Sequence, residues 1–207
     1  MKNFAINIGR SVGSGGHEIG KLLASKLKWN FYDNELIKMA AIKSGFSEEL
    51  FEAYDEKRSI ITSPLFDYFP GTSGSININS TPTVISEEYL FKIHSDVMKK
   101  LSEDSNAIFI GRCADYILRD TAECINIFCF APKEFRIKNL SGKLNIEESK
   151  VEKLISKGDK SRSAYYAKFT DKKWGAAESY HLLIDTSLLG IQETAEYIND
   201  YIERRIR

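Results

Sequence analysis

Five short apolar runs alternate with segments of helical periodicity along the chain, at about residues 4–9, 29–33, 106–111, 124–130 and 181–185. The run at 106–111 shows no alternation of apolar and polar positions, which is typical of a central parallel strand covered on both faces. Strands that alternate with helices in this way need right-handed crossover connections. The pattern therefore predicts an α/β fold with three layers around a five-stranded parallel sheet.

The helical segments are marked by apolar residues three or four positions apart. Such sets predict a helix after the first strand, one from about Ser86 and a last one near the end of the chain; they are Ile19, Leu22, Leu23 and Leu27, then Leu90, Ile93, Val97 and Leu101, then Ile191, Ala195, Ile198 and Ile202. His94 is adjacent to the second set, so we expect it at the core edge or surface and not as a ligand.

Acidic and basic residues balance, with 29 of each among 207 residues. A chain without net charge has no general attraction for nucleic acid or for an anionic membrane. No apolar run approaches the roughly 18 residues that span a bilayer. The three cysteines, Cys113, Cys124 and Cys129, lack the spacing of a zinc site and are predicted to be buried thiols. We expect a single cytoplasmic domain over residues 1–207, with no nucleic-acid or membrane partner.

Two long segments depart from this regular pattern. Residues at about 59–83 mix proline, glycine and small polar residues with aromatic ones, which predicts a long loop. Its aromatic residues favour a flap or a subunit contact, so a homodimer is one alternative. Residues at about 133–173 are highly charged and helical, with Asp159 and Arg162 on one face. Such a segment is typical of a lid that closes over a ligand, the alternative being a solvated hairpin with a surface ion pair.

Candidate chemistry is concentrated in the glycine-rich turn after the first strand, Gly13-Ser14-Gly15-Gly16-His17-Glu18. Glycines allow successive N–H groups to face one concavity, and the helix that follows adds the positive end of its dipole. The turn departs from the Walker A motif, because Gly16 stands where the lysine should be and Glu18 lies near the position of the metal-binding hydroxyl. The two interpretations are a phosphate cradle and a simple tight turn.

Two flanking residues, Arg10 and His17, favour the cradle because they can supply the missing positive charge. Arg10 is the better substitute, since a guanidinium is always charged whereas a histidine is mostly neutral at pH 7. Asp33 ends the second apolar run, where it can cap the next helix or face a ligand at the carboxyl end of a parallel strand. One residue can serve both purposes, so both alternatives stay open.

With these motifs the chain resembles the cytidylate-kinase-like family, a divergent branch of the P-loop nucleoside monophosphate kinases, over nearly its whole length. The resemblance is carried by Arg10 and the glycine-rich turn, and by residues 31–37, 110–118 and 159–166 together with Trp174-Gly175, Tyr180 and residues 184–187. It implies a three-layer P-loop NTPase-like fold with a helical lid. It also implies transfer of the ATP γ-phosphate to CMP or a related (deoxy)nucleotide, with Mg²⁺ held through water and phosphates and not directly by the protein.

The resemblance further implies roles for individual residues. Arg112 matches an arginine that recognises the acceptor nucleotide in cytidylate kinases, although Cys113 replaces the aspartate that follows it there. Arg136 and Arg162 are the candidates for lid arginines that hold transferring phosphates. The resulting hypothesis has three groups: the turn at residues 13–18 binds the ATP phosphates; Asp33, Arg112 and Arg136 bind the acceptor; and Arg10, Asp159 and Arg162 are catalytic.

Two other function classes stay open. One is a degenerate P-loop module that binds a nucleotide or another phosphate as a signal without transferring it, which the missing lysine and Cys113 favour. The other is a structural or interaction protein that uses the loop at about 59–83.

Overall fold

The computed structural model of the protein describes residues 2–43, 45 and 87–207, so the loop expected at about 59–83 lies outside the described residues. Its centre is a five-stranded sheet in the order β2-β3-β1-β4-β5, in which every pairing is parallel. The strands are β1 (Phe4–Arg10), β2 (Asn30–Tyr32), β3 (Ala107–Ile110), β4 (Glu123–Phe130) and β5 (Leu182–Asp185). The predicted strands and the parallel α/β architecture are confirmed.

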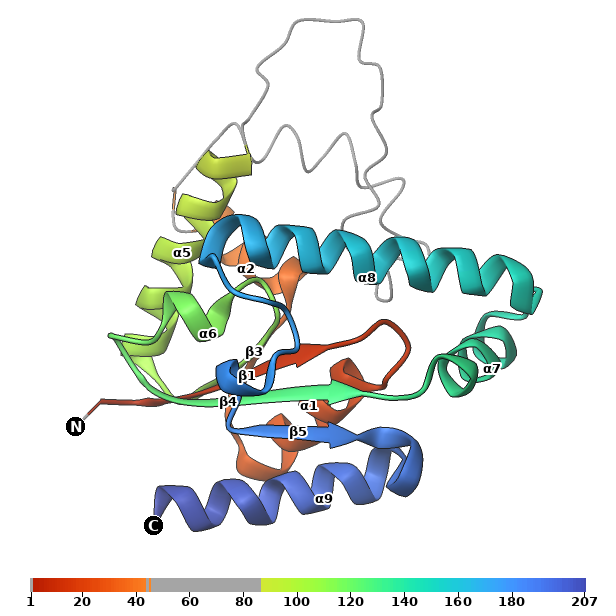
Figure 1. Cartoon of the computed structure of the whole chain (residues 1–207). Helices are drawn as coiled ribbons and strands as arrows, with labels where there is room; N and C mark the ends of the chain where they lie inside the picture. Colours follow the sequence, from red (N-terminus) through yellow and green to blue (C-terminus); the bar gives the residue numbers. More distant parts are fainter. Residues whose placement is uncertain (1, 44, 46–86) are drawn as a thin grey trace, which may run out of the picture.

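Helices cover both faces of the sheet, as Figure 1 shows, with α9 along one face and α8 across the other. On the first face lie α1 (Gly16–Leu27) and α9 (Thr186–Ile206). The second face carries α2 (Asn34–Lys43), α5 (Glu87–Asp104), the short α6 (Ala114–Ile117) and α8 (Glu148–Thr170). The remaining helix, α7 (Lys133–Leu144), joins β4 to α8, and a short 3₁₀ turn (Ala177–Ser179) precedes β5.

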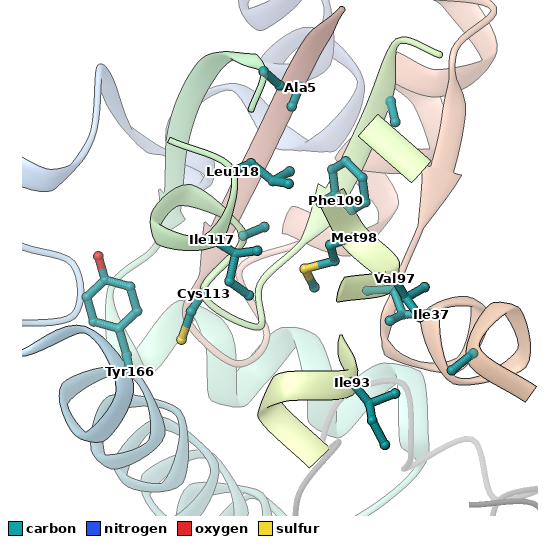
Figure 2. Close-up of a cluster of buried hydrophobic side chains, with 14 residues drawn as sticks. Ala5, Ile37, Ile93, Val97, Met98, Phe109, Cys113, Ile117, Leu118 and Tyr166 are labelled. Atoms are coloured by element: carbon teal, nitrogen blue, oxygen red, sulfur yellow. The ribbon is translucent and has the colours of Figure 1, made fainter. Parts of the chain in front are cut away.

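The sheet separates two apolar cores, and β3 contributes to both. Ala107 and Phe109 face the core under α2, α5 and α6, whereas Ile108 and Ile110 face the core under α1 and α9. All four side chains are fully buried, which confirms the prediction of a central strand covered on both faces. Figure 2 shows the first of these cores, with Phe109 against Met98 and Val97 of α5. His94 of α5 is buried as well, which agrees with a core position.

A third, smaller core joins the predicted lid to the glycine-rich turn. Val12 of the turn packs with Leu140 of α7 and with Val151 and Ile155 of α8. The far end of α8 is held by Tyr166, whose hydroxyl donates to Asp115 of α6 at 2.7 Å. The charged segment at 133–173 is therefore a pair of helices packed directly over the turn. None of the helices in the described residues has the length and apolar character needed to cross a membrane.

Candidate functional site

A cavity of about 220 Å³ opens beside the turn between β1 and α1. Its wall contains most of the residues that the sequence singles out for phosphate binding and catalysis: Arg10, Gly13, Gly15, Gly16, His17, Glu18 and Arg162. Ser11 and Lys21 complete the wall, and the sequence reasoning missed both. The signal for Lys21 was its spacing, because it lies four residues after His17 and so shares a face of α1.

The backbone of the turn offers unsatisfied donors to this cavity. The first hydrogen bond inside α1 runs from the N–H of Ile19 to the carbonyl of Gly15 at 2.9 Å. The N–H groups of Gly16 and His17 precede it and therefore have no acceptor within the helix. Together with the positive end of the helix dipole they form a site for an anion, and phosphate is the usual occupant of such sites.

The turn needs glycine for steric as well as conformational reasons. Gly13 and Gly15 have positive φ values of 81° and 80°. A Cβ on Gly13 would lie 2.8 Å from Cδ1 of Leu140, and one on Gly15 would lie 2.9 Å from Cγ1 of Ile191. The turn is therefore pressed between α7 and α9, which fixes the direction of its N–H groups.

Ser14 was predicted to bind phosphate with the other amides of the turn, but its N–H donates to the carbonyl of Ser11 at 3.2 Å and it is not part of the cavity wall. Its side chain is 2 % exposed and points into the turn, where the hydroxyl lies 2.9 Å from the carbonyl oxygen of Ser11 and 3.0 Å from that of Cys129. Its own carbonyl accepts a hydrogen bond from Oγ1 of Thr186 at 2.7 Å. Ser14 thus shapes the turn, because its hydroxyl adds a second partner to two carbonyls that already accept from the backbone N–H groups of Ser14 and Ser11.

The side chain of Arg10 occupies the room that a side chain at position 16 would need. A Cβ on Gly16 would lie 2.7 Å from Cβ of Arg10 and 3.2 Å from Cβ of Cys129. From there Arg10 extends until its guanidinium rests against Gly111, at the end of β3. Burial, followed by the charges of Arg162 and Arg112, lowers the pKa of the Arg10 guanidinium well below its usual value. The position without a lysine is therefore packed against the aliphatic part of Arg10, whose guanidinium lies further along, at Gly111.

Arg162 of α8 reaches the same place from the other side of the cavity. Its Nη1 donates to the backbone carbonyl of Arg10 at 2.9 Å. Burial lowers the pKa of Arg162 to about 10, with Asp159 opposing the shift, so the guanidinium stays charged at neutral pH.

Arg112 lies behind these two residues, outside the cavity wall, with its guanidinium 5.2 Å from the ring centroid of Tyr165. Its charge contributes to lowering the pKa of both Arg10 and Arg162. An anion bound near Arg10 and Arg162 would stabilise the charged forms that their neighbours disfavour.

Arg136, predicted to take part in acceptor binding, contacts the backbone of the turn and is not in the cavity wall. Its Nε donates to the carbonyl of Ala131 at 3.0 Å and its Nη1 to that of Val12 at 2.9 Å, and it is 9 % exposed. Nη1 also lies 2.7 Å from Oδ2 of Asp159, whose Oδ1 accepts from the N–H of Val12 at 2.8 Å. Neither Arg136 nor Asp159 lines the cavity. The pair clamps both backbone groups of Val12, so in this arrangement it positions the turn and does not touch a ligand.

Asp33 serves as a helix cap and as a partner of the site. Its Oδ1 accepts from the N–H of Leu36 at 3.0 Å, which caps α2, and its Oδ2 lies 3.1 Å from Nε2 of His17. Burial raises the pKa of Asp33, but the hydrogen bonds from His17 and Leu36 outweigh it and leave the pKa below its usual value. Asp33 is linked to the cavity through His17 and is not itself part of the wall.

Cys113 stands where the family's acceptor-binding aspartate is expected, but it is part of the core. It is 3 % exposed, and Figure 2 shows it beside Ile117 in the first apolar core. Burial raises the pKa of its thiol to about 12, so the sulfur is neutral. It therefore provides no substitute for a carboxylate.

Carboxylates that could assist a cation are few near the cavity. Glu18 is in the wall and forms an ion pair with Lys143 of α7, with Oε1 and Nζ 3.2 Å apart. No group of three or more histidine, cysteine, aspartate or glutamate side chains within the described ranges could hold a metal ion. A cation at this place would therefore depend on oxygen atoms from a bound ligand, which is how Mg²⁺ commonly binds together with phosphates.

Comparison with solved structures identifies proteins with the same fold. An uncharacterised protein from Eubacterium ventriosum ATCC 27560 matches with a TM-score of 0.69 and 22 % identity, over 97 % of this chain and 99 % of that chain. Shikimate kinase from Bacteroides thetaiotaomicron matches with a TM-score of 0.52 and 13 % identity, over 97 % of this chain and 98 % of that chain. Shikimate kinase from Acinetobacter baumannii, in complex with shikimate, matches with a TM-score of 0.50 and 14 % identity, over 99 % of this chain and 95 % of that chain.

At these identities the similarity establishes the fold, that of the P-loop kinases, and leaves the substrate undetermined. Among proteins with curated descriptions, none matches the chain significantly. The model of the cytidylate kinase-like family matches residues 5–188. Because this match spans most of the chain, the protein belongs to the cytidylate kinase-like family.

Proposed function

We propose that the protein is a cytoplasmic phosphotransferase that binds ATP with Mg²⁺ and transfers the γ-phosphoryl group to CMP or a related (deoxy)nucleotide. The observation that carries the proposal is the convergence of two guanidinium groups, Arg10 and Arg162, on a cavity whose wall includes the glycine-rich turn. Unlike Arg136, which binds the backbone of the turn, Arg10 and Arg162 are both in the cavity wall, where their charge can meet an anion.

Phosphoryl transfer needs positioning and positive charge more than it needs a strong base. The N–H groups of Gly16 and His17 are suited to hold the phosphates of the donor. Arg10 and Arg162 supply charge at the oxygens where negative charge develops. When bound, Mg²⁺ would neutralise charge on the phosphate oxygens, which are the hard oxygen ligands that it prefers.

Arg112 is the candidate for the acceptor side, because its guanidinium belongs to the same cluster of charge as Arg10 and Arg162. With Cys113 neutral and buried, the carboxylate that reads the base in cytidylate kinases has no counterpart at this position. We therefore expect the acceptor to be selected by its phosphate more strongly than by its base, and CMP to be one of several acceptors.

The second candidate is a regulatory module that binds a nucleotide without transferring phosphate. The glycine at position 16 favours it, since loss of one well-placed charge from such a site costs roughly 3–7 kcal/mol of transition-state stabilisation. The kinase is favoured instead by Arg10, which packs against position 16 and can supply the charge that the missing lysine would bring.

The experiment that separates the two candidates incubates the pure protein with ATP, Mg²⁺ and each nucleoside monophosphate while ADP is measured. ADP that forms only when an acceptor is present supports the kinase. ATP binding without ADP, for every acceptor tried, supports the regulatory module.

A further inference from the structure

Glu18 is an acidic side chain in the wall of a cavity that is otherwise built for an anion. The other charged side chains of that wall, among the described residues, are Arg10, Lys21 and Arg162. Burial raises the pKa of Glu18, but its own backbone N–H and Lys143 outweigh burial and leave the pKa below its usual value. Glu18 is therefore ionised at neutral pH and faces the place where phosphate groups would lie.

This placement is unfavourable for a bare polyphosphate. Two negative groups within one cavity repel each other, and the low dielectric constant of a partly closed site strengthens the repulsion. An acid in the first turn of a helix is favourable for the free protein, because it faces the positive end of the dipole. That benefit is available on any face of the helix, so it does not account for an acid on the side that faces the anion site.

A divalent cation between the carboxylate and the phosphates removes the conflict. Mg²⁺ prefers oxygen ligands and is commonly held by one or two carboxylates together with phosphate oxygens. Glu18 lies two residues after Gly16, near the place in the turn where a P-loop carries its metal-binding hydroxyl. Lys143 holds the carboxylate in the free protein, and its side chain is 36 % exposed, so it has room to withdraw into solvent.

We propose that Glu18 is a direct ligand of the divalent cation that accompanies a bound triphosphate, and that the cation displaces Lys143, which binds the same carboxylate from outside the cavity wall in the free protein. The inference rests on the proposed binding of ATP and adds to it a metal ligand from the protein itself. It also gives Lys143 a role as the group that the cation displaces.

The test uses Mn²⁺ and AMPPNP, a non-hydrolysable ATP analogue, so that binding is measured without turnover. Free Mn²⁺ is followed by electron paramagnetic resonance, and AMPPNP affinity is measured by calorimetry with Mn²⁺ and separately with EDTA. For Glu18→Gln we expect the affinity for Mn²⁺–AMPPNP to fall by about ten- to a hundredfold. The affinity for AMPPNP in EDTA should stay equal or rise, because the repulsion is gone.

A loss of affinity for Mn²⁺–AMPPNP without a loss for AMPPNP in EDTA identifies Glu18 as a metal ligand. A purely structural role of Glu18 would weaken binding of both forms. Lys143→Met should give the complementary result, with weaker binding of AMPPNP in EDTA and equal or tighter binding of Mn²⁺–AMPPNP. Glu196→Gln, on the exposed side of α9, removes a carboxylate away from the turn and should change neither affinity. Thermal unfolding of each variant verifies that it is folded.

The outcomes distinguish this inference from the proposed function. In the first case the wild type binds AMPPNP, but Glu18→Gln has the affinity of the wild type for both forms or loses affinity for both equally. That result overturns the role of Glu18 and leaves the proposed function standing. Wild-type protein that binds AMPPNP in neither condition overturns the proposed function, and the metal ligand with it.

Discussion

The carboxylate of Asp159 accepts a hydrogen bond from the backbone N–H of Val12, although the two residues are 147 positions apart in the chain. The same carboxylate binds Arg136, which in turn donates to the carbonyl of Val12. One residue of the glycine-rich turn is thus held on both of its backbone groups by α7 and α8. The lid helices and the turn therefore form one hydrogen-bonded unit.

Asp159→Ala should lower the free energy of unfolding by up to about 3 kcal/mol, because it leaves Arg136 and the N–H of Val12 without their acceptor in a mostly buried place. Urea denaturation measures the effect. The matched control is Glu152→Ala, which breaks the exposed pair with Lys133 and should cost much less, because solvent screens that pair. Equal losses in the two variants would mean that the clamp adds no stability beyond that of a surface pair.

Gly16→Ala should weaken ATP binding without unfolding the protein. The added Cβ would lie 2.7 Å from Cβ of Arg10, so the arginine would have to move away from the turn or the turn away from it. We expect a loss of at least about tenfold in affinity, equivalent to 1.4 kcal/mol. Calorimetric titration with ATP is the measurement.

Gly142→Ala serves as the comparison for that variant. Gly142 lies within α7 and a Cβ there would meet no atom within 4 Å, so the alanine should leave binding unchanged and stabilise the helix by about 1 kcal/mol. If Gly16→Ala bound ATP as tightly as Gly142→Ala, Arg10 would not depend on the glycine as described here.

Arg162→Ala should reduce turnover far more than ATP binding. An arginine that stabilises the transferring phosphoryl group contributes about 10³-fold or more to kcat in related chemistry, whereas a ground-state contact contributes much less. Steady-state kinetics with ATP and the best acceptor, together with the Kd for ATP, separate the two effects. Arg162→Lys keeps the charge but not the planar donor arrangement and should recover only part of the rate. An unchanged kcat in Arg162→Ala would remove Arg162 from the mechanism.

The fold could be predicted from the sequence because its determinants are local. Unbroken apolar runs such as 106–111 and the four-residue spacing of Ile19 and Leu23 depend only on neighbouring residues, and the structure places each in the expected element. The glycine-rich turn was equally visible as a turn, and the structure places it between β1 and α1 as expected.

The roles of Ser14 and Arg136 could not be predicted in the same way. Whether the hydroxyl of Ser14 faces a ligand or the carbonyl of Cys129 depends on the path of the turn, which Leu140 and Ile191 fix from distant parts of the chain. Arg136 lies on the first turn of α7, and only the packing of that helix against Val12 aims its side chain at the backbone of the turn. Long-range packing of this kind leaves no periodic signal in the sequence.

The pair formed by His17 and Asp33 should make stability depend on pH in the acid range. The pKa of Asp33 is lower in the folded protein than its usual value of 3.8, so the folded state favours the ionised form. This stabilisation is present above the unfolded pKa and is lost as the pH falls through the folded one. The free energy of unfolding of the wild type should therefore decrease as the pH is lowered below about 4.

Asp33→Asn is the variant that isolates this effect, because asparagine caps a helix about as well as aspartate but does not ionise. We expect it to be less stable than the wild type at pH 7 and to approach the wild type as the pH falls to about 3, where the aspartate is protonating as well. Urea denaturation at several pH values measures the difference in free energy of unfolding between the two proteins. The contributions of the other carboxylates are the same in both and cancel in this difference. A difference that stays constant from pH 7 to pH 3 would show that the ionisation of Asp33 contributes nothing to folding.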